Sequence, residues 1–190
     1  SYGPIDNFEK HLEADWWKRI FNSMYLKTDS DVVDDKAITE SETNQFIQIL
    51  GIDPAHVILD LACGQGRHSL ALSRKGYKNV HGLDRSHYLI QKAKSVNQKE
   101  SLDVSFKEGD ARKLPYSNDY FDVVMILGNS FGYFENIEDD LKVLKEVFRV
   151  LKPEGKFLID LADGEYLKKH YNPRSWEWLD SNHFVCRERN

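Results

Sequence analysis

The sequence predicts a doubly wound α/β fold of the Rossmann-like type, in which a mainly parallel sheet carries helices on both faces. Short apolar runs alternate along the chain with stretches whose apolar residues recur every three or four positions. The most apolar of these runs are almost continuous, which is typical of strands buried on both faces. The first run leads directly into a Gly-x-Gly turn and then a helix, a connection found where parallel sheets bind ligands.

The N-terminal residues 1–51 are predicted to be helical. Apolar side chains four positions apart indicate one amphipathic helix over residues 6–26. These side chains are Phe8, Leu12, Trp16 and Ile20. Thr39 and Glu42 have the spacing of a capping box, which predicts a second helix that ends at Gly51.

Residues 56–162 are predicted to form the core of the domain. Strands are expected at 56–62, 79–84, 103–110, 121–127 and 156–162. Helices are expected after the first, second and fourth strands. The first would run from Arg67 to Lys75, and Ser86 and Asn136 would cap the other two. We expect Pro153 to stop the last of these helices.

Residues 163–190 are predicted to form part of a lid or the start of a C-terminal hairpin. Residues 175–189 alternate aromatic and polar side chains, as strands do. The segment looks too short to hold a helix and two strands, so we expect the C-terminal part of the fold to be missing. A bare sheet edge would result, which favours a homodimer.

The composition argues for one domain and against several classes of partner. The chain has 190 residues and a net charge of −5, so no overall basic field attracts nucleic acid. No apolar run is long enough to cross a bilayer. Cys63 and Cys186 give no disulfide framework, and His81 and His87 lack metal-ligand spacing with either cysteine. We therefore expect a cytoplasmic protein without a metal site.

Glycines and acids gather at the predicted strand ends. Gly64 and Gly66 let the backbone turn sharply and leave room for the edge of a ligand. Asp84 ends the second strand, 18 residues after Gly66, and is placed to bind a ribose diol. Asp110 ends the third strand and extends the same crevice. Together these residues predict a nucleoside-type ligand.

The turn lacks the features of a dinucleotide or phosphate site. A dinucleotide fingerprint requires a third glycine where this chain has Ser69. The phosphate loop Gly-x-x-x-x-Gly-Lys-Ser/Thr is also absent from the sequence. Asp60 stands four residues before Gly64 and suits an ammonium group. A ligand with an adenine, a ribose and an amino-acid tail fits best, which describes S-adenosylmethionine.

The motifs resemble those of the class I S-adenosylmethionine-dependent methyltransferases, and within them the small-molecule "methyltransferase domain" type. The resemblance covers residues 15–165. It rests on "LDLACGQGRHS", "GLDRS", "GDARKLPY", "FDVVMILGNSFGYF" and "VLKPEGKFLID", in this order. The chain lacks the Asp/Asn-Pro-Pro-aromatic sequence of enzymes that methylate nucleic-acid bases. The resemblance thus implies methyl transfer to a small-molecule acceptor, and not to nucleic acid.

The resemblance also implies positions for the cofactor. The methionine moiety would lie beside Asp60, Ala62, Gly64 and Gly66, and the ribose beside Asp84. The adenine would lie beside Asp110 and Ala111, and the methyl sulfonium beside Leu127 and Gly128. Tyr25, Arg85 and Arg112 complete the predicted cofactor set. Trp16, Trp17 and Tyr25 would belong to an N-terminal helical lid. S-adenosylhomocysteine would be the product.

Methyl transfer from a sulfonium mainly requires nucleophile and methyl group to be held in line. A general base is needed only if the nucleophile arrives protonated. His68, Asn129 and Tyr133 are candidates for catalytic roles. A histidine in the position of His68 is more often a capping or packing group, and Asn129 and Tyr133 are equally loop-packing residues.

Two alternatives remain open. An NAD(P)-dependent oxidoreductase would need the third glycine and a catalytic Tyr-x-x-x-Lys, neither of which is seen. A methyltransferase-like module that binds the cofactor without turnover is compatible with every motif. Because the C-terminal part of the fold is expected to be missing, we predict cofactor binding with weak or absent turnover.

Overall fold

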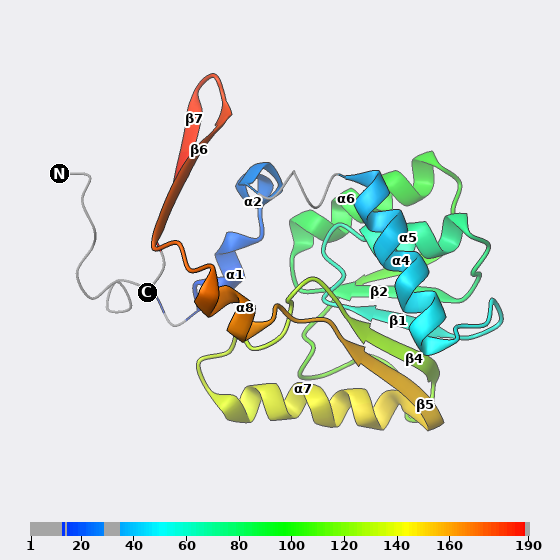
Figure 1. The fold of residues 1–190 in the computed structure, drawn as a ribbon. Helices are drawn as coiled ribbons and strands as arrows, with labels where there is room; N and C mark the ends of the chain where they lie inside the picture. Colours follow the sequence, from blue (N-terminus) through cyan, green and yellow to red (C-terminus); the bar gives the residue numbers. More distant parts are fainter. Residues whose placement is uncertain (1–12, 14, 29–34, 189–190) are drawn as a thin grey trace.

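A computed structural model describes residues 13, 15–28 and 35–188, and its centre is a five-stranded parallel sheet (Figure 1). The strands are β1 (Ile58–Leu61), β2 (Val80–Asp84), β3 (Val104–Glu108), β4 (Phe121–Ile126) and β5 (Leu151–Ile159). Their order across the sheet is β3-β2-β1-β4-β5. The strands β2 and β3 therefore lie on one side of β1, and β4 and β5 lie on the other. Ligands bind at such a switch point in the strand order, here between β1 and β4.

Helices cover both faces of this sheet, which confirms the doubly wound α/β prediction. The four helices that pack on it are α4 (Lys36–Leu50), α5 (Arg67–Arg74), α6 (His87–Lys99) and α7 (Ile137–Val150). Ile58 and Val123 point towards α4, α5 and α6, and Leu59 and Val124 point towards α7. Figure 1 shows α7 alone on its face.

The fifth strand begins earlier than predicted. The sequence suggested residues 156–162, and β5 covers Leu151–Ile159. Pro153 therefore does not stop α7, which ends at Val150, but lies inside the strand. Pro153 is tolerated there because β5 is an edge strand whose pairing shifts register between Phe121 and Val123.

The N-terminal prediction of one helix over residues 6–26 is wrong in the described residues, and residues 6–12 lie outside them. The chain forms two short helices, α1 (Trp17–Ile20) and α2 (Ser23–Thr28). The break falls at Phe21, whose φ of −81° and ψ of 73° are not helical. Asn22 accepts a hydrogen bond from the backbone N–H of Met24 and so starts the second helix. Apolar periodicity did not reveal this local cap.

The predicted capping box of Thr39 and Glu42 is also wrong. The cap of α4 is Asp35, whose carboxylate accepts from the backbone N–H groups of Ala37 and Ile38. Thr39 lies inside the helix and donates its hydroxyl to the Asp35 carbonyl. Glu42 is thereby left to interact with α5, as described below.

The C-terminal segment holds a helix and two strands, so the prediction that it is too short is wrong. The elements are α8 (Gly164–Lys169), β6 (Arg174–Asp180) and β7 (His183–Glu188). The two strands form the predicted hairpin through a connection of only Ser181 and Asn182, which needs fewer residues than expected.

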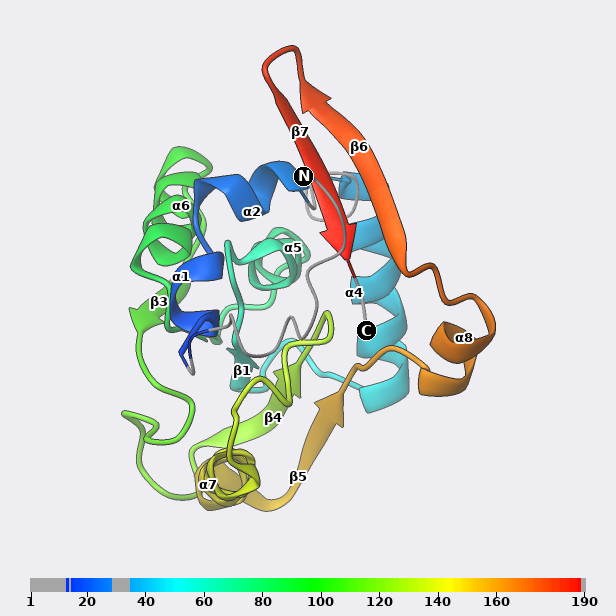
Figure 2. The same ribbon diagram turned by 90° about the vertical axis from the view of Figure 1, so that its left-hand side faces the viewer.

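The hairpin does not complete the main sheet. Among the residues that the structure describes, β6 and β7 pair only with each other, and β5 remains the edge of the five-stranded sheet. Figures 1 and 2 show the hairpin rising away from the core beside α2. An ion pair of 3.0 Å joins Asp180 to Lys27 of α2. Trp176 and Trp178 of β6 are 77% and 73% exposed.

Candidate functional site

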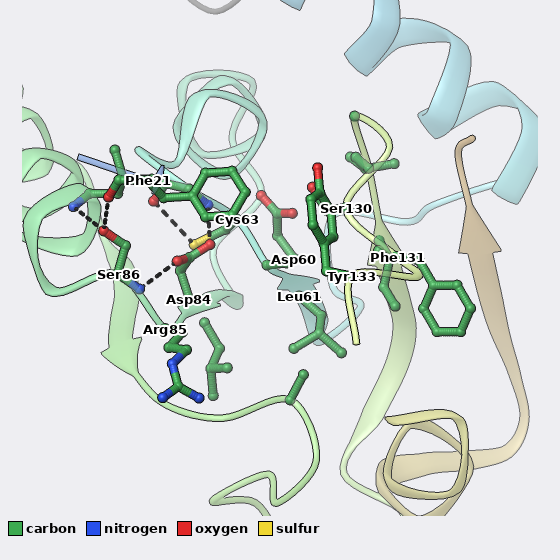
Figure 3. A pocket seen from close by; sticks show the side chains of 18 of the residues that line it. Phe21, Asp60, Leu61, Cys63, Asp84, Arg85, Ser86, Ser130, Phe131 and Tyr133 are labelled. Carbon is green, nitrogen blue, oxygen red and sulfur yellow. Dashed lines mark hydrogen bonds between the residues drawn. The ribbon is translucent and has the colours of Figure 1, made fainter. Parts of the chain in front are cut away.

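A cavity of about 300 Å³ opens at the carboxyl ends of β1, β2 and β4 (Figure 3). Its walls come from the turn after β1, the end of β2, the loop after β3 and the loop after β4. Trp17 of α1, Tyr25 of α2 and Phe21 between the two helices also line it. The cavity thus lies at the switch point of the sheet, where the sequence predicted a ligand.

Left-handed backbone shapes the turn between β1 and α5. Ala62, Gly64 and Gly66 have φ values of 59°, 55° and 76°. The backbone N–H of Gly64 donates to Asp84 Oδ2 over 2.8 Å, which ties the turn to the end of β2. A Cβ on Gly64 would meet only Leu89, at 3.8 Å. Gly64 therefore keeps the pocket wall open.

Gly66 has a different environment from that of Gly64. It does not line the cavity. A Cβ on Gly66 would lie 2.5 Å from Cζ of Phe106, and a Cβ on Gly82 would lie 2.6 Å from the same ring. The Phe106 side chain of β3 fills the space above both glycines. The structure thus gives Gly66 a packing role in the core.

One buried acid, Asp60, and one partly buried acid, Asp84, flank the turn. Asp60 Oδ2 accepts from the Ser69 hydroxyl over 2.6 Å, so the residue in place of a third glycine holds this carboxylate. Asp84 accepts from the backbone N–H groups of Gly64 and Ser86. Burial raises the pKa of Asp60, and it raises the pKa of Asp84, to which the nearby Asp60 charge adds. A cation or hydroxyl donor in the cavity would relieve this cost.

Asp110 lines the cavity within a network of arginines. It accepts three hydrogen bonds from Arg112, through the backbone N–H, Nε and Nη2, and one from Arg85 Nη1. The side-chain bonds to Arg112 are the main reason that the pKa of Asp110 is lowered. Four bonds use the four lone-pair positions of a carboxylate. Asp110 therefore frames the pocket, and Arg112 lies behind it, outside the cavity lining.

The N-terminal helices close one side of the cavity. The Trp17 ring lies 4.6 Å from the Arg85 guanidinium and 5.1 Å from the Phe134 ring. Phe21 lies edge-on to Tyr133, with ring centroids 5.6 Å apart. The Ser86 hydroxyl donates to the Phe21 carbonyl over 2.7 Å. Aromatic contacts and this hydrogen bond hold the helices over the end of β2.

Most residues of the predicted cofactor set line one cavity. They are Tyr25, Asp60, Ala62, Gly64, Asp84, Arg85, Asp110, Ala111, Leu127 and Gly128. Gly66 and Arg112 are the two that do not.

Two of the three candidate catalytic residues lie at the cavity, and the third lies outside its lining. His68 and Tyr133 line the cavity, and Asn129 does not. Asn129 has a φ of 60° and accepts from the backbone N–H of Ala162, so it stabilises the turn after β4. His68 is buried, and its Nε2 lies 2.8 Å from Glu42 Oε2.

Sequence reasoning missed Arg67 and Glu42. Arg67 lines the cavity directly after the glycine turn, so its position in the motif was a usable signal. Glu42 approaches it from α4, and nothing in the local sequence indicates that contact. Within residues 13, 15–28 and 35–188, no group of three His, Cys, Asp or Glu side chains could hold a metal ion. In the same residues, no helix is long and apolar enough to cross a membrane.

Comparison with known proteins agrees with the geometry. The family model described as "Methyltransferase domain" matches residues 58–155. A demethylmenaquinone methyltransferase from Lactobacillus johnsonii is 37% identical over 116 residues, 59% of this chain and 46% of that protein. A glycine/sarcosine N-methyltransferase from Halorhodospira halochloris is 32% identical over 141 residues, 74% of this chain and 52% of that protein. The chain spans about half the length of these relatives.

A solved structure has the same fold. It is an S-adenosylmethionine-dependent methyltransferase from Clostridium acetobutylicum, with a TM-score of 0.69 and 24% identity. The likeness covers 87% of this chain and 65% of that one. The match of the family model covers more than half of the 190 residues, from β1 into β5. This chain therefore belongs to the methyltransferase domain family.

Proposed function

We propose that this chain binds S-adenosylmethionine in the cavity and transfers its methyl group to a small-molecule acceptor, with S-adenosylhomocysteine as the product. The observation that carries the proposal is the pairing of Gly64 with Asp84. It places an ionisable carboxylate beside an open stretch of backbone at the adjacent ends of β1 and β2. This arrangement suits a nucleoside ribose at the switch point.

The neighbouring groups suit the rest of the cofactor. Asp84 accepts two backbone hydrogen bonds, which leaves two lone-pair positions for the ribose hydroxyls. The Asp60 carboxylate at the end of β1 suits the methionine ammonium group, whose positive charge would offset the cost of burial. Leu127 and Gly128 line the far wall, where we place the sulfonium. The aromatic faces of Phe21 and Tyr133 attract such a cation.

The chemistry then follows from positioning. Displacement at the methyl carbon needs the acceptor atom in line with the departing sulfur, and the sulfur leaves as a neutral thioether. A cavity of about 300 Å³ closed by aromatic side chains favours a small acceptor over a polymer. The named relatives point the same way, since demethylmenaquinone, glycine and sarcosine are small molecules.

His68 is the group we assign to proton removal when the acceptor is protonated. It lines the cavity, and the hydrogen bond to Glu42 fixes its ring. An orienting carboxylate on one ring nitrogen is the arrangement that general bases use. We also place the protein in the cytoplasm, where its free thiols, Cys63 and Cys186, stay reduced.

Calorimetric titration with S-adenosylmethionine, S-adenosylhomocysteine and NADH tests the ligand. We expect binding of the first two and none of NADH. Binding of NADH alone would replace the proposal with the oxidoreductase alternative. A screen of amine, hydroxyl, thiol and carbon acceptors with methyl-labelled cofactor then tests transfer. Tight cofactor binding without transfer to any acceptor would leave a binding module and refute the enzymatic part.

A further inference from the structure

The helix α7 carries apolar side chains on two of its faces. One face is buried against the sheet through its valines. The other face is a line of four apolar side chains at spacings of four, three and four residues, which we call the α7 stripe: Ile137, Leu141, Leu144 and Phe148. This is the spacing of the seam along which two helices pack on each other.

Most of the α7 stripe is exposed. Phe148 is 84% exposed and Ile137 is 72% exposed, and Leu141 is exposed as well. Figure 1 shows α7 alone on its face of the sheet, so in the part of the chain that the structure describes no second helix covers the stripe. Contiguous exposed apolar side chains of this kind mark an interaction site.

The α7 stripe lies beside the edge of the sheet. On another side of α7, Asp139 and Glu146 accept hydrogen bonds from Arg112 and Leu114 in the loop after β3. The stripe is turned away from this loop, and thus towards β5, whose side chains on this face are only partly buried. A doubly wound sheet normally has this face covered by more than one helix. The stripe and the face of β5 therefore leave room for another helix.

The charges of α7 are arranged in a self-complementary order. The first turn is acidic and the last turn is basic. Glu138 and Lys145 are exposed near the stripe, and neither takes part in the ion pairs that the described residues of α7 form. A second α7 that runs antiparallel would bring its basic end to the acidic end of the first. Antiparallel helices also place opposite ends of their dipoles together.

A two-fold axis between Leu141 and Leu144 satisfies both the apolar and the charge patterns. Ile137 would then meet Phe148 of the second copy, and Leu141 would meet Leu144 of the second copy. Glu138 would lie near Lys145 of the second copy, and this contact would occur twice. A two-fold interface requires one surface that complements itself, and the α7 stripe has this property.

We propose that the α7 stripe is the interface of a homodimer, in which α7 packs antiparallel on α7 of a second copy. The inference does not rest on the proposed function. The part of α7 that lines the cavity is Val143, which belongs to the buried face. Ligand binding in the cavity should therefore be the same in the monomer and in the dimer.

The size of the contact sets the expected affinity. A helix of 14 residues is about 21 Å long, so two such helices and the neighbouring parts of β5 form an interface at the low end of the usual sizes. Interfaces of this size are weak, and we expect a dissociation constant of about 1–100 μM.

Sedimentation velocity of the whole chain between about 1 and 300 μM measures this equilibrium. Phe148→Lys and Ile137→Lys should each raise the dissociation constant at least about tenfold, because both copies lose a buried apolar side chain. Ile49→Lys is the matched control, since Ile49 is an isoleucine of α4 that is 69% exposed. It should leave the dissociation constant unchanged.

Charge reversal tests the antiparallel arrangement. Glu138→Lys and Lys145→Glu should each weaken the dimer at least about fivefold, because two attractive contacts become repulsive. An equal mixture of these two single variants should dimerise nearly as well as the wild type, since every rim contact between unlike copies is attractive again. A folding defect in either variant would not be repaired by mixing.

The remaining outcomes would overturn the inference. A wild-type chain that stays monomeric over the whole range has no such interface, and species larger than a dimer contradict the two-fold arrangement. A dimer that withstands Phe148→Lys but is lost in Trp176→Ser/Trp178→Ser uses the hairpin instead. Charge-reversed variants that mixing does not rescue contradict the antiparallel packing. Titration of Phe148→Lys with S-adenosylhomocysteine should give the wild-type affinity, and a changed affinity would contradict the separation of stripe and cavity.

Discussion

Replacing Gly66 by alanine separates a packing role from a ligand-binding role. Two costs follow from the structure. A non-glycine residue at the observed φ of 76° costs about 1–2 kcal/mol. A Cβ only 2.5 Å from the buried Phe106 ring adds overpacking of about 1–3 kcal/mol. The expected loss of about 2–5 kcal/mol is a large share of a typical unfolding free energy of ~5–15 kcal/mol.

Gly76 supplies a control for the backbone term. Its φ is 92°, and a Cβ there would meet nothing within 4 Å. Gly76→Ala should therefore cost only the backbone strain. Urea unfolding followed by circular dichroism measures both variants, and we expect Gly66→Ala to be the more destabilised by about 1–3 kcal/mol.

A double-mutant cycle tests the contact directly. Phe106→Leu withdraws the ring from Gly66, so Gly66→Ala should cost less in that background by about 1–3 kcal/mol. Folded Gly66→Ala should keep its affinity for S-adenosylhomocysteine, because Gly66 does not line the cavity. Equal costs at Gly66 and Gly76, zero coupling to Phe106, or a binding defect without a stability defect would each refute the reasoning.

Three further predictions concern the acids and the N-terminal helices. Asp84→Asn should weaken S-adenosylhomocysteine at least about tenfold in calorimetry, since the carboxylate charge strengthens bonds to ribose hydroxyls; an unchanged affinity in a folded variant would remove Asp84 from the site. Trp17→Ala should raise the ligand dissociation rate in stopped-flow traces about 3- to 30-fold, because it removes the ring stacked on Arg85; an unaltered rate would show that α1 does not retain the ligand. The pKa of Glu42 is about 2 in the fold against an ordinary 4.5, so its stabilising effect is present above pH 4.5 and is lost as the pH falls towards 2. Glu42→Gln should flatten that part of the unfolding free energy against pH by ~1 kcal/mol, less than the whole pKa shift implies because solvent screens this partly exposed carboxylate. An unaltered acid profile would contradict the assignment.

The core of the fold could be predicted because its signals are local. The strands β1 (ILDL) and β4 (FDVVMI) are largely apolar. Gly51, Ser86 and Asn136 mark helix ends that the structure keeps. The predicted cofactor positions mostly follow strand ends, and parallel strands bring their carboxyl ends to one edge. The order of strands in the sequence is therefore enough to predict that these cofactor residues lie together at one edge of the sheet.

The remaining features depend on tertiary contacts. The packing of Phe106 against Gly66 joins β3 to the turn after β1, and no pattern around either residue indicates it. The pairing of Glu42 with Arg67 likewise joins α4 to α5. On α7 the buried stripe is Val143, Val147 and Val150, while Ile137 and Phe148 are exposed, since periodicity gives an apolar face but not which of two faces is covered.

The hairpin and the N-terminal helices divide the four tryptophans into two optical populations. Trp176 and Trp178 stand on β6, largely in solvent. Trp16 and Trp17 are partly buried, against Tyr133 and Phe134. Acrylamide should therefore quench one half of the intrinsic fluorescence freely whether or not a ligand is bound. Trp17, which lines the cavity, should become protected as the cavity fills, and this makes the wild-type chain its own binding sensor without any attached dye.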